Sequence, residues 1–399
     1  QGVAGSGKTT VAMHRISYIL YNYAEDFRPE DFYIIGSNRI LLNYITSVLP
    51  DLDVYGVRQM TMEQLFIRLL YEDWDPRFHQ VRPADTADPQ FCLKSSLSWF
   101  QDLAAFCAEY ERREIPGEDV RLKKTGALLL SAAAIRACLE THPDLSMQEK
   151  KNLLNETLVA RLENELSGKY VSCTPEEKKE LFRTLRRHFG QKRWKGSIFE
   201  VYREFLQSQQ DRGKTVSMPE PVFESGSSAQ TQAGRTAFDL YDLAALAYLY
   251  RRIKETDRIR EASHMIIDEA QDFGMMAYSA LAFCLRGCTY TIMGDISQNI
   301  HFGCGLNDWE ELKRLILTGD FDRFDVLKKS YRNTVEIAHF AADILRHGNF
   351  PVYPSEPVNR RGSQVRVIQC ADEKALTEEC IRTIRAWQSL GHETIAVIC

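Results

Sequence analysis

The stretch Gly2-Val3-Ala4-Gly5-Ser6-Gly7-Lys8-Thr9 lies almost at the start of the chain and fits the pattern G-x-x-x-x-G-K-[ST] in full. Its glycines let the backbone curl so that several N–H groups point to one place, where the oxygens of a triphosphate would lie. Lys8 has the length to reach the β- and γ-phosphates, and the Thr9 hydroxyl is a ligand for Mg²⁺. Apolar residues recur at helical spacing over 10–23, so a helix N-terminus would face the same anion. The pattern predicts a nucleotide site, and its place at the edge of the sequence indicates a chain cut from a longer protein.

The composition is that of an ordinary globular protein, with 399 residues of which 44% are apolar and 26% charged. No apolar run approaches the roughly 20 residues of a membrane helix, and no signal peptide is recognisable. We therefore expect a cytoplasmic protein of about two or three domains with no membrane partner. The net charge of −5 means that contacts to nucleic acid would have to come from local patches. The ten cysteines include no paired C-x-x-C spacing, which favours buried, reduced thiols over a metal site or a disulfide.

Long helical patterns dominate residues 89–236, whereas strand and helix patterns alternate on both sides of this segment. We expect one α/β domain from residues 1–88 and 237–320, interrupted by a helical insert over 89–236. Residues 321–399 would begin a second, incomplete α/β unit. The expected strands lie at 32–35, 264–267, 290–293, 365–368 and 394–399, and a helix is expected over 40–49.

Acidic residues follow one of these strands in the stretch His264-Met265-Ile266-Ile267-Asp268-Glu269-Ala270-Gln271-Asp272. The pattern places two carboxylates at the carboxyl end of a buried parallel strand, where an open α/β sheet presents its ligand. We expect Asp268 to hold Mg²⁺ and Glu269 to orient or deprotonate the attacking water. The alternative is a strand followed by a solvated acidic turn, which the phosphate loop makes less attractive.

Two further segments carry polar residues suited to the same site, Tyr290–Gln298 and Leu327–Thr334. Gln298 would sense the γ-phosphate through its amide, while Asp295 would hold the loop by hydrogen bonding. Arg332 would approach from the second α/β unit and stabilise charge on the transferred phosphoryl group, and Tyr331 would stack near the base. A surface arginine at the start of a helix is the alternative for Arg332.

In this order the four segments resemble the UvrD/Rep type of superfamily-one helicases: phosphate loop, D-E-x-Q-D, G-D-x-x-Q and Y-R. The stretches 2–15, 38–50, 307–312 and 394–399 resemble the HelD-like branch, the RNA polymerase recycling ATPases. The resemblance covers about residues 1–75 and 238–399. It implies a P-loop, RecA-like parallel-sheet motor domain with a large helical insert, plus the start of a second RecA-like domain. ATP and Mg²⁺ would lie between the two domains, and nucleic acid would run across their top.

The resemblance also implies which residues hold each ligand. ATP would be bound by Gly2, Gly5, Ser6, Gly7, Lys8, Thr9, Thr10 and Tyr331, and Mg²⁺ by Thr9 and Asp268. Glu269, Gln298 and Arg332 would act in hydrolysis. Ser37, Asn38 and Thr61 match backbone contacts to nucleic acid, although Asn38 and Thr61 are equally well explained as helix caps. Phe302 would stack on a base, but Cys304 stands where these helicases carry an arginine, which puts efficient unwinding in doubt.

We therefore expect an ATP-dependent DNA helicase or translocase of the UvrD/Rep type that acts on single-stranded DNA or at duplex junctions. The alternative is an RNA polymerase-binding recycling ATPase with little or no unwinding. A small-molecule phosphotransferase remains a third reading, without an evident acceptor site. Because motifs before Gln1 and beyond Cys399 are absent, this chain should hydrolyse ATP poorly.

The insert holds the strongest basic run of the sequence, with aromatic residues Phe189 and Trp194 interleaved. Its cations are Arg183, Arg186, Arg187, His188, Lys192, Arg193 and Lys195. One interpretation is binding to nucleic acid or to an acidic partner. The other is a solvated helix face balanced by Glu176, Glu177 and Glu180.

Overall fold

The computed structural model describes residues 1–23, 25, 27–37, 42, 49–52, 54–167, 173–222, 234–254, 261–301, 303–348 and 352–398. Its centre is a four-stranded sheet in which all neighbouring strands run parallel. In spatial order these strands are β2 (Arg58–Thr61), β1 (Phe32–Gly36), β8 (His264–Ile267) and β9 (Thr289–Ile292). The α/β class and the strands expected at 32–35, 264–267 and 290–293 are confirmed to within a residue. The helix expected over 40–49 falls almost wholly outside the described residues.

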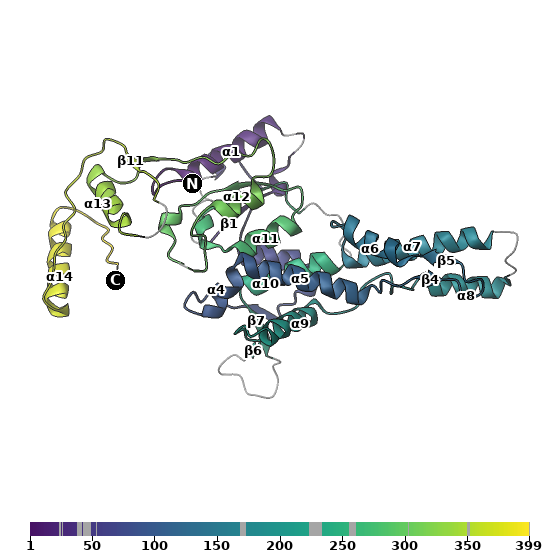
Figure 1. Cartoon of the computed structure of the whole chain (residues 1–399). Helices are drawn as coiled ribbons and strands as arrows, with labels where there is room; N and C mark the ends of the chain where they lie inside the picture. Colours follow the sequence, from purple (N-terminus) through teal and green to yellow (C-terminus); the bar gives the residue numbers. More distant parts are fainter. Residues whose placement is uncertain are drawn as a thin grey trace.

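Both faces of the sheet are covered by helices (Figure 1). Every residue of β1 is buried, as expected for a central parallel strand. Because side chains alternate along a strand, Phe32 and Ile34 pack in a cluster with α1 (Lys8–Asn22), whereas Tyr33 and Ile35 join a larger cluster on the other face. That second face is covered by α3 (Met62–Leu69), α10 (Leu240–Ile253) and α11 (Met275–Cys284).

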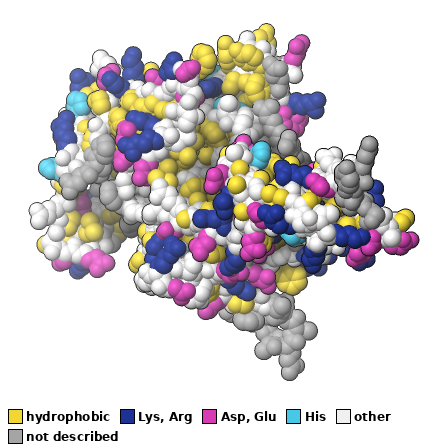
Figure 2. All heavy atoms as spheres, turned by 45° about the vertical axis from the view of Figure 1, so that its right-hand side comes forward, with side chains coloured by type: hydrophobic (Ala, Val, Ile, Leu, Met, Phe, Trp, Pro, Cys, Tyr) yellow, Lys and Arg dark blue, Asp and Glu magenta, His cyan; other side chains and the backbone are white. Residues whose placement is uncertain are grey.

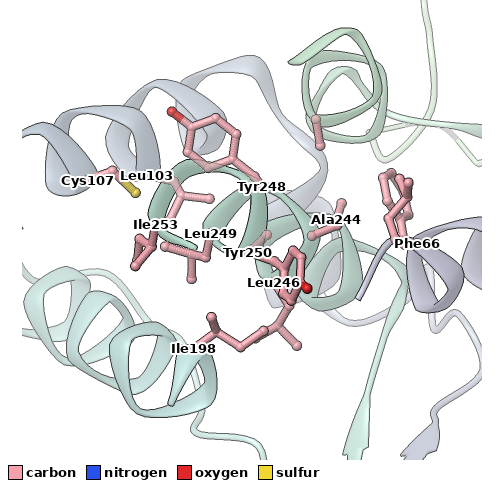
Figure 3. Packing of buried hydrophobic residues seen from close by; sticks show 14 of the residues in the cluster. Phe66, Leu103, Cys107, Ile198, Ala244, Leu246, Tyr248, Leu249, Tyr250 and Ile253 are labelled. Carbon is pink, nitrogen blue, oxygen red and sulfur yellow. The ribbon is translucent and has the colours of Figure 1, made fainter. Parts of the chain in front are cut away.

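Helix α10 lies at the centre of the larger cluster. It is buried around almost its whole circumference, as an all-round apolar helix must be. Figure 3 shows its side chains among those of Leu103 and Cys107 from α5 (Leu97–Glu114), Ile198 from α9 (Ile198–Asp211) and Phe66 from α3. The helices of residues 89–236 therefore share one apolar core with the sheet domain.

The chain leaves the sheet domain and returns to it at neighbouring strands. β3 (His79–Val81) pairs in parallel with β7 (Arg235–Phe238), and β6 (Pro221–Val222) adds to β7 in antiparallel direction. Between them, an arm projects from the sheet domain (Figure 1). It contains β4 (Val120–Arg121), β5 (Leu128–Leu130), α6 (Ala132–Thr141), α7 (Met147–Leu166) and α8 (Pro175–Leu185). The base of this segment is formed by α4 (Pro89–Ser95), α5 and α9.

The expectation that all cysteines are reduced is wrong for one pair. Cys92 of α4 and Cys304, which follows the 290–298 segment, form a disulfide across 212 residues of sequence. Sequence spacing gave no sign of it, because the two residues meet only after the insert has packed against the sheet domain.

The strands expected at 365–368 and 394–399 are also not formed. Residues 365–368 and 394–398 have no strand partner within the described part of the chain, and Cys399 lies outside it. Their apolar side chains are solvent-exposed, with Val367 78% and Ile398 96% accessible. After α12 (Glu310–Ile316), the regular elements of this region are β10 (Lys329–Ser330), α13 (Val335–Leu345), β11 (Glu356–Pro357) and α14 (Glu373–Ser389), and β10 pairs with β11 in parallel.

The most apolar helices are short, with ten residues in α11 and eleven in α13. No helix in the described part of the chain combines the length and hydropathy that crossing a bilayer requires.

Candidate nucleotide site

The phosphate-loop sequence lies at the carboxyl edge of the sheet. Backbone bonds fix it there, from Gly2 N–H to Gly294 O at 3.0 Å and from Val3 N–H to Leu327 O at 3.1 Å. Gly5 and Gly7 have φ angles of 70° and 78°, which glycine adopts without steric cost. Helix α1 begins directly after them, at Lys8. Because the first N–H groups of a helix have no carbonyl partner within it, they are left to bind an anion at the loop.

One hydrogen bond joins the loop to the acidic strand end. The Thr9 hydroxyl donates to Asp268 Oδ2 at 2.7 Å, although the two residues are 259 positions apart. Asp268 directly follows β8 and is only 1% exposed. Its burial raises the pKa of the carboxyl group, as does the nearby charge of Glu269, while the bond from Thr9 opposes the shift. A buried carboxylate beside a threonine hydroxyl is the oxygen donor set that Mg²⁺ takes together with phosphate oxygens.

The loop itself contains groups suited to binding an anion. Ser6 Oγ is buried and has no hydrogen-bond partner within the described residues. Lys8 is half-buried and its Nζ bends back to donate to Gly2 O at 2.7 Å, so the ammonium group stays inside the curl of the loop. Thr10 is exposed in the first turn of α1. The described residues contain no cluster of three or more His, Cys, Asp or Glu side chains for a metal ion, so Mg²⁺ would depend on the phosphates for its remaining ligands.

Glu269 has an unusual backbone conformation and a fixed side chain. Its φ of 50° is in the left-handed region, where a residue with a Cβ is strained. Its Oε2 accepts a hydrogen bond from Gln271 Nε2 at 2.8 Å, and Gln271 Oε1 accepts one from the Asp295 N–H at 2.9 Å. A Cβ at Gly294 would lie 2.6 Å from the same Gln271 oxygen, so a larger residue there would displace the Gln271 side chain. Gln271 thus couples the acidic turn to the 294–298 segment.

Asp295 holds the segment that ends β9, as predicted. Its carboxylate is 2% exposed and accepts bonds from Gln1 Nε2 at 2.8 Å, Ser297 Oγ at 2.6 Å and Gln298 Nε2 at 2.6 Å. Gln298 is otherwise solvent-exposed. The contact of its amide with a γ-phosphate therefore stays a prediction. To make this contact, the amide would have to give up its hydrogen bond to Asp295.

Residues 330–332 pack directly on the loop. The Ser330 hydroxyl donates to Ala4 O at 2.8 Å and the Tyr331 N–H donates to Gly5 O at 2.9 Å. A Cβ at Gly5 would lie 2.4 Å from the Cβ of Arg332. Both the Tyr331 and Arg332 side chains are exposed beside the loop, where a bound nucleotide could reach them.

Of the four residues predicted to contact nucleic acid, two have structural roles at strand ends and two lie outside the described part of the chain. Ser37 follows β1, and its hydrogen bond to Asp272 partly offsets the burial that raises the pKa of that carboxyl. Thr61 ends β2 and caps α3, accepting from the Gln64 N–H at 3.4 Å. Both therefore have structural roles at neighbouring strand ends. Asn38 and Phe302 lie outside the described residues.

Sequence reasoning missed the bridging role of Gln271 and the unpaired hydroxyl of Ser6, although both stand inside the motifs it used. A polar residue in an acidic turn, with Gly-Asp following the next strand, is the signal that was present for Gln271. No protein-family model matches the chain, and no curated protein sequence matches it significantly.

Proposed function

We propose that the chain is the nucleotide-binding part of an ATP-driven motor of the UvrD/Rep type, with a P-loop, RecA-like fold. The observation that carries this proposal is the 2.7 Å bond between Thr9 Oγ1 and Asp268 Oδ2, because it brings the loop and the acidic strand end to one point. A glycine loop or an acidic turn alone occurs in many sites, but their convergence at a parallel sheet edge suits a magnesium-triphosphate.

Each residue then has a role that follows from its position. Thr9 and Asp268 would hold Mg²⁺, which when bound would neutralise phosphate charge. The Lys8 ammonium and the α1 N–H groups would hold the phosphates, and Ser6 would gain the partner that its hydroxyl lacks. Glu269, held by Gln271, would accept a proton from the attacking water, and Arg332 would stabilise charge from the opposite side.

The test is equilibrium binding of a fluorescent ATP analogue with and without Mg²⁺. Lys8→Ala and Thr9→Val should weaken binding at least about tenfold, which corresponds to one lost charged or metal contact of about 1.4 kcal/mol. Lys374→Ala, an exposed lysine on α14, is the matched control and should change nothing. Equal affinity in the wild type and Lys8→Ala, or binding indifferent to Mg²⁺, would contradict the proposal.

A second candidate is an RNA polymerase-binding ATPase with little unwinding. One observation favours it: Cys304, in the place of the helicase arginine, is 1% exposed and bonded to Cys92 of the insert. A side chain buried in this way faces the insert and not a strand of nucleic acid. The two candidates separate in an assay of ATP turnover, because single-stranded DNA should stimulate the first and RNA polymerase the second.

A further inference from the structure

The arm carries a groove of about 750 Å³ that lies apart from the nucleotide site. One wall is α7, and the other is the segment 186–193 that follows α8. Four exposed cations line it: Arg186, Arg187, Lys192 and Arg193. Figure 2 turns the right-hand side of Figure 1, where the arm lies, towards the viewer, and dark-blue Lys and Arg side chains are spread over that side among magenta acidic ones.

Side-chain amides of α7 fix the segment that bears these cations. The bonds run from Gln148 Nε2 to Gln191 O at 2.8 Å, from Asn152 Nδ2 to Lys192 O at 3.2 Å and from Asn155 Nδ2 to Gly190 O at 3.3 Å. The three amides stand four and three residues apart, on one face of the helix. Gln148 and Asn155 are buried, and Asn155 Oδ1 also accepts from the N–H of the buried Phe189 at 3.0 Å. The backbone is thus pinned while the charged side chains point outward, which lowers the entropy lost on binding.

Two of the acidic residues expected to balance the basic run form ion pairs outside the groove, one with Lys124 and the other with Arg183 of the run itself. Glu177 pairs with Lys124 at 2.8 Å, and Glu180 pairs with Arg183 at 2.7 Å. In the part of the chain that the structure describes, no ion pair joins the four groove cations to a carboxylate. Glu156 and Glu163 of α7 also line the groove, so its lining has four positive and two negative groups.

The surroundings favour a phosphate chain over a protein surface. A protein interface needs apolar or aromatic anchors at its centre. Within the described residues of 147–197, no large hydrophobic side chain is strongly exposed, and Val159 and Ala160 are the apolar residues of the lining. Arg and Lys side chains hold phosphodiester oxygens without reading bases. We propose that this groove binds the sugar-phosphate backbone of single-stranded nucleic acid, at a site independent of the nucleotide chemistry proposed above.

The test is fluorescence anisotropy with a labelled single-stranded DNA oligonucleotide over a range of salt concentrations. The double variant Arg187→Glu/Arg193→Glu should weaken binding at least about tenfold at low salt. It should also reduce the slope of log K against log salt by about 1.4, since each phosphate contact contributes about 0.7 on single strands. The matched control is Arg183→Glu/Arg203→Glu, which changes net charge equally at exposed positions outside the groove lining and should stay within about twofold.

A local readout separates the groove from any binding along the sheet edge. Bound oligonucleotide should protect Lys192 from acetylation, whereas Lys374 should react as before. Equal effects of the two double variants, or an unprotected Lys192, would overturn the proposal. So would displacement of the oligonucleotide by polyglutamate of equal charge at the same concentration, because that result would identify an acidic polypeptide as the partner. The Lys8→Ala variant should bind the oligonucleotide as the wild type does. A failure of the proposed nucleotide site can therefore be distinguished from a failure of the proposed groove site.

Discussion

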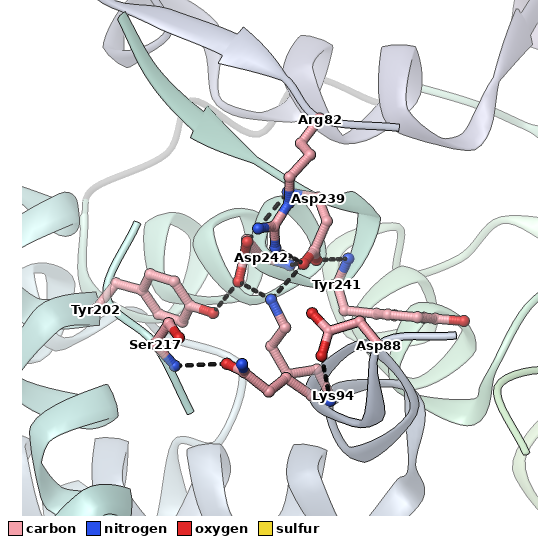
Figure 4. Close-up of polar contacts among 9 residues, drawn as sticks. Arg82, Asp88, Lys94, Tyr202, Ser217, Asp239, Tyr241 and Asp242 are labelled. Carbon is pink, nitrogen blue, oxygen red and sulfur yellow. Dashed lines mark hydrogen bonds and ion pairs between the residues drawn. The ribbon is translucent and has the colours of Figure 1, made fainter. Parts of the chain in front are cut away.

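Replacing Lys94 by methionine should strongly destabilise the packing of the insert helices α4 and α9 against α10 of the sheet domain. Lys94 lies in α4 and is 6% exposed; its ammonium contacts Asp239 and donates to Asp242 Oδ1 at 2.7 Å (Figure 4). Both carboxylates are buried at the start of α10. Arg82 also reaches Asp239 at 2.9 Å, and the Tyr202 hydroxyl of α9 donates to Asp242 Oδ1 at 2.6 Å. The Lys94 ammonium thus links α4 of the insert to the start of α10 in the sheet domain.

The size of the expected loss in stability follows from the hydrogen bonds that the two carboxylates keep after the ammonium is removed. Asp239 keeps Arg82 and two N–H groups of its own helix, at 3.0 Å each. Asp242 keeps only neutral donors, from Tyr202 and from the Asp239 N–H. Losing the partner of a buried charge costs about 3–5 kcal/mol. Because a domain of this kind is stable by only about 5–15 kcal/mol, this is a large fraction of the total.

The effect should depend on pH in a defined direction. Burial, followed by repulsion from Asp239, already raises the pKa of Asp242, whereas Lys94 and Arg82 hold the pKa of Asp239 low. Without Lys94 both pKa values rise. The folded pKa of Asp242 then lies further above its unfolded value, so at this residue the folded state binds more protons than the unfolded state and stability increases as pH falls. Lys94→Met should therefore recover stability from pH 7 towards pH 5.

The assay is urea unfolding followed by tryptophan fluorescence at both pH values. Arg113→Met is the control, because its ion pair with Glu204 is half exposed and should be worth less than about 1 kcal/mol. Adding Asp242→Asn to Lys94→Met should restore part of the lost stability. A loss of stability in Lys94→Met no larger than that in the control, or one independent of pH, would mean that Lys94 does not compensate the buried charge of Asp242.

Three other perturbations have defined outcomes. Gly5→Ala should force Arg332 away from the loop, since the φ is 70° and the new Cβ would lie 2.4 Å from the Cβ of Arg332; hydrogen exchange at residues 330–332 should accelerate. Burial lowers the pKa of His264 to about 4, so this residue should contribute stability above its unfolded pKa of about 6.5 that is lost as pH falls towards 4. His264→Gln should flatten that part of a pH–stability curve. Reduction of the Cys92–Cys304 disulfide, which closes 212 residues, should lower stability by up to about 5 kcal/mol in denaturant titrations, and Cys304→Ser should abolish the response to reductant.

Local patterns predicted the parts of the fold that depend on local physics. The buried strands at 32–35 and 264–267 follow from continuous apolar runs, and the loop before α1 follows from its glycines. The same reasoning failed at 365–368, where the alternation of Val365 and Val367 is typical of a strand. A strand exists only where a neighbour pairs with it, and no local pattern contains that neighbour.

Adjacent residues supply the chemistry that is available: a glycine loop that tolerates positive φ, a lysine and threonine at its end, and acids placed after a buried strand. Folding of the whole chain brings Thr9 within 2.7 Å of Asp268, makes Gln271 a bridge between two turns, and joins Cys92 to Cys304. The two contributions differ because backbone conformation and side-chain chemistry are properties of a few adjacent residues. Which distant segments become neighbours depends instead on how the whole chain buries its apolar surface.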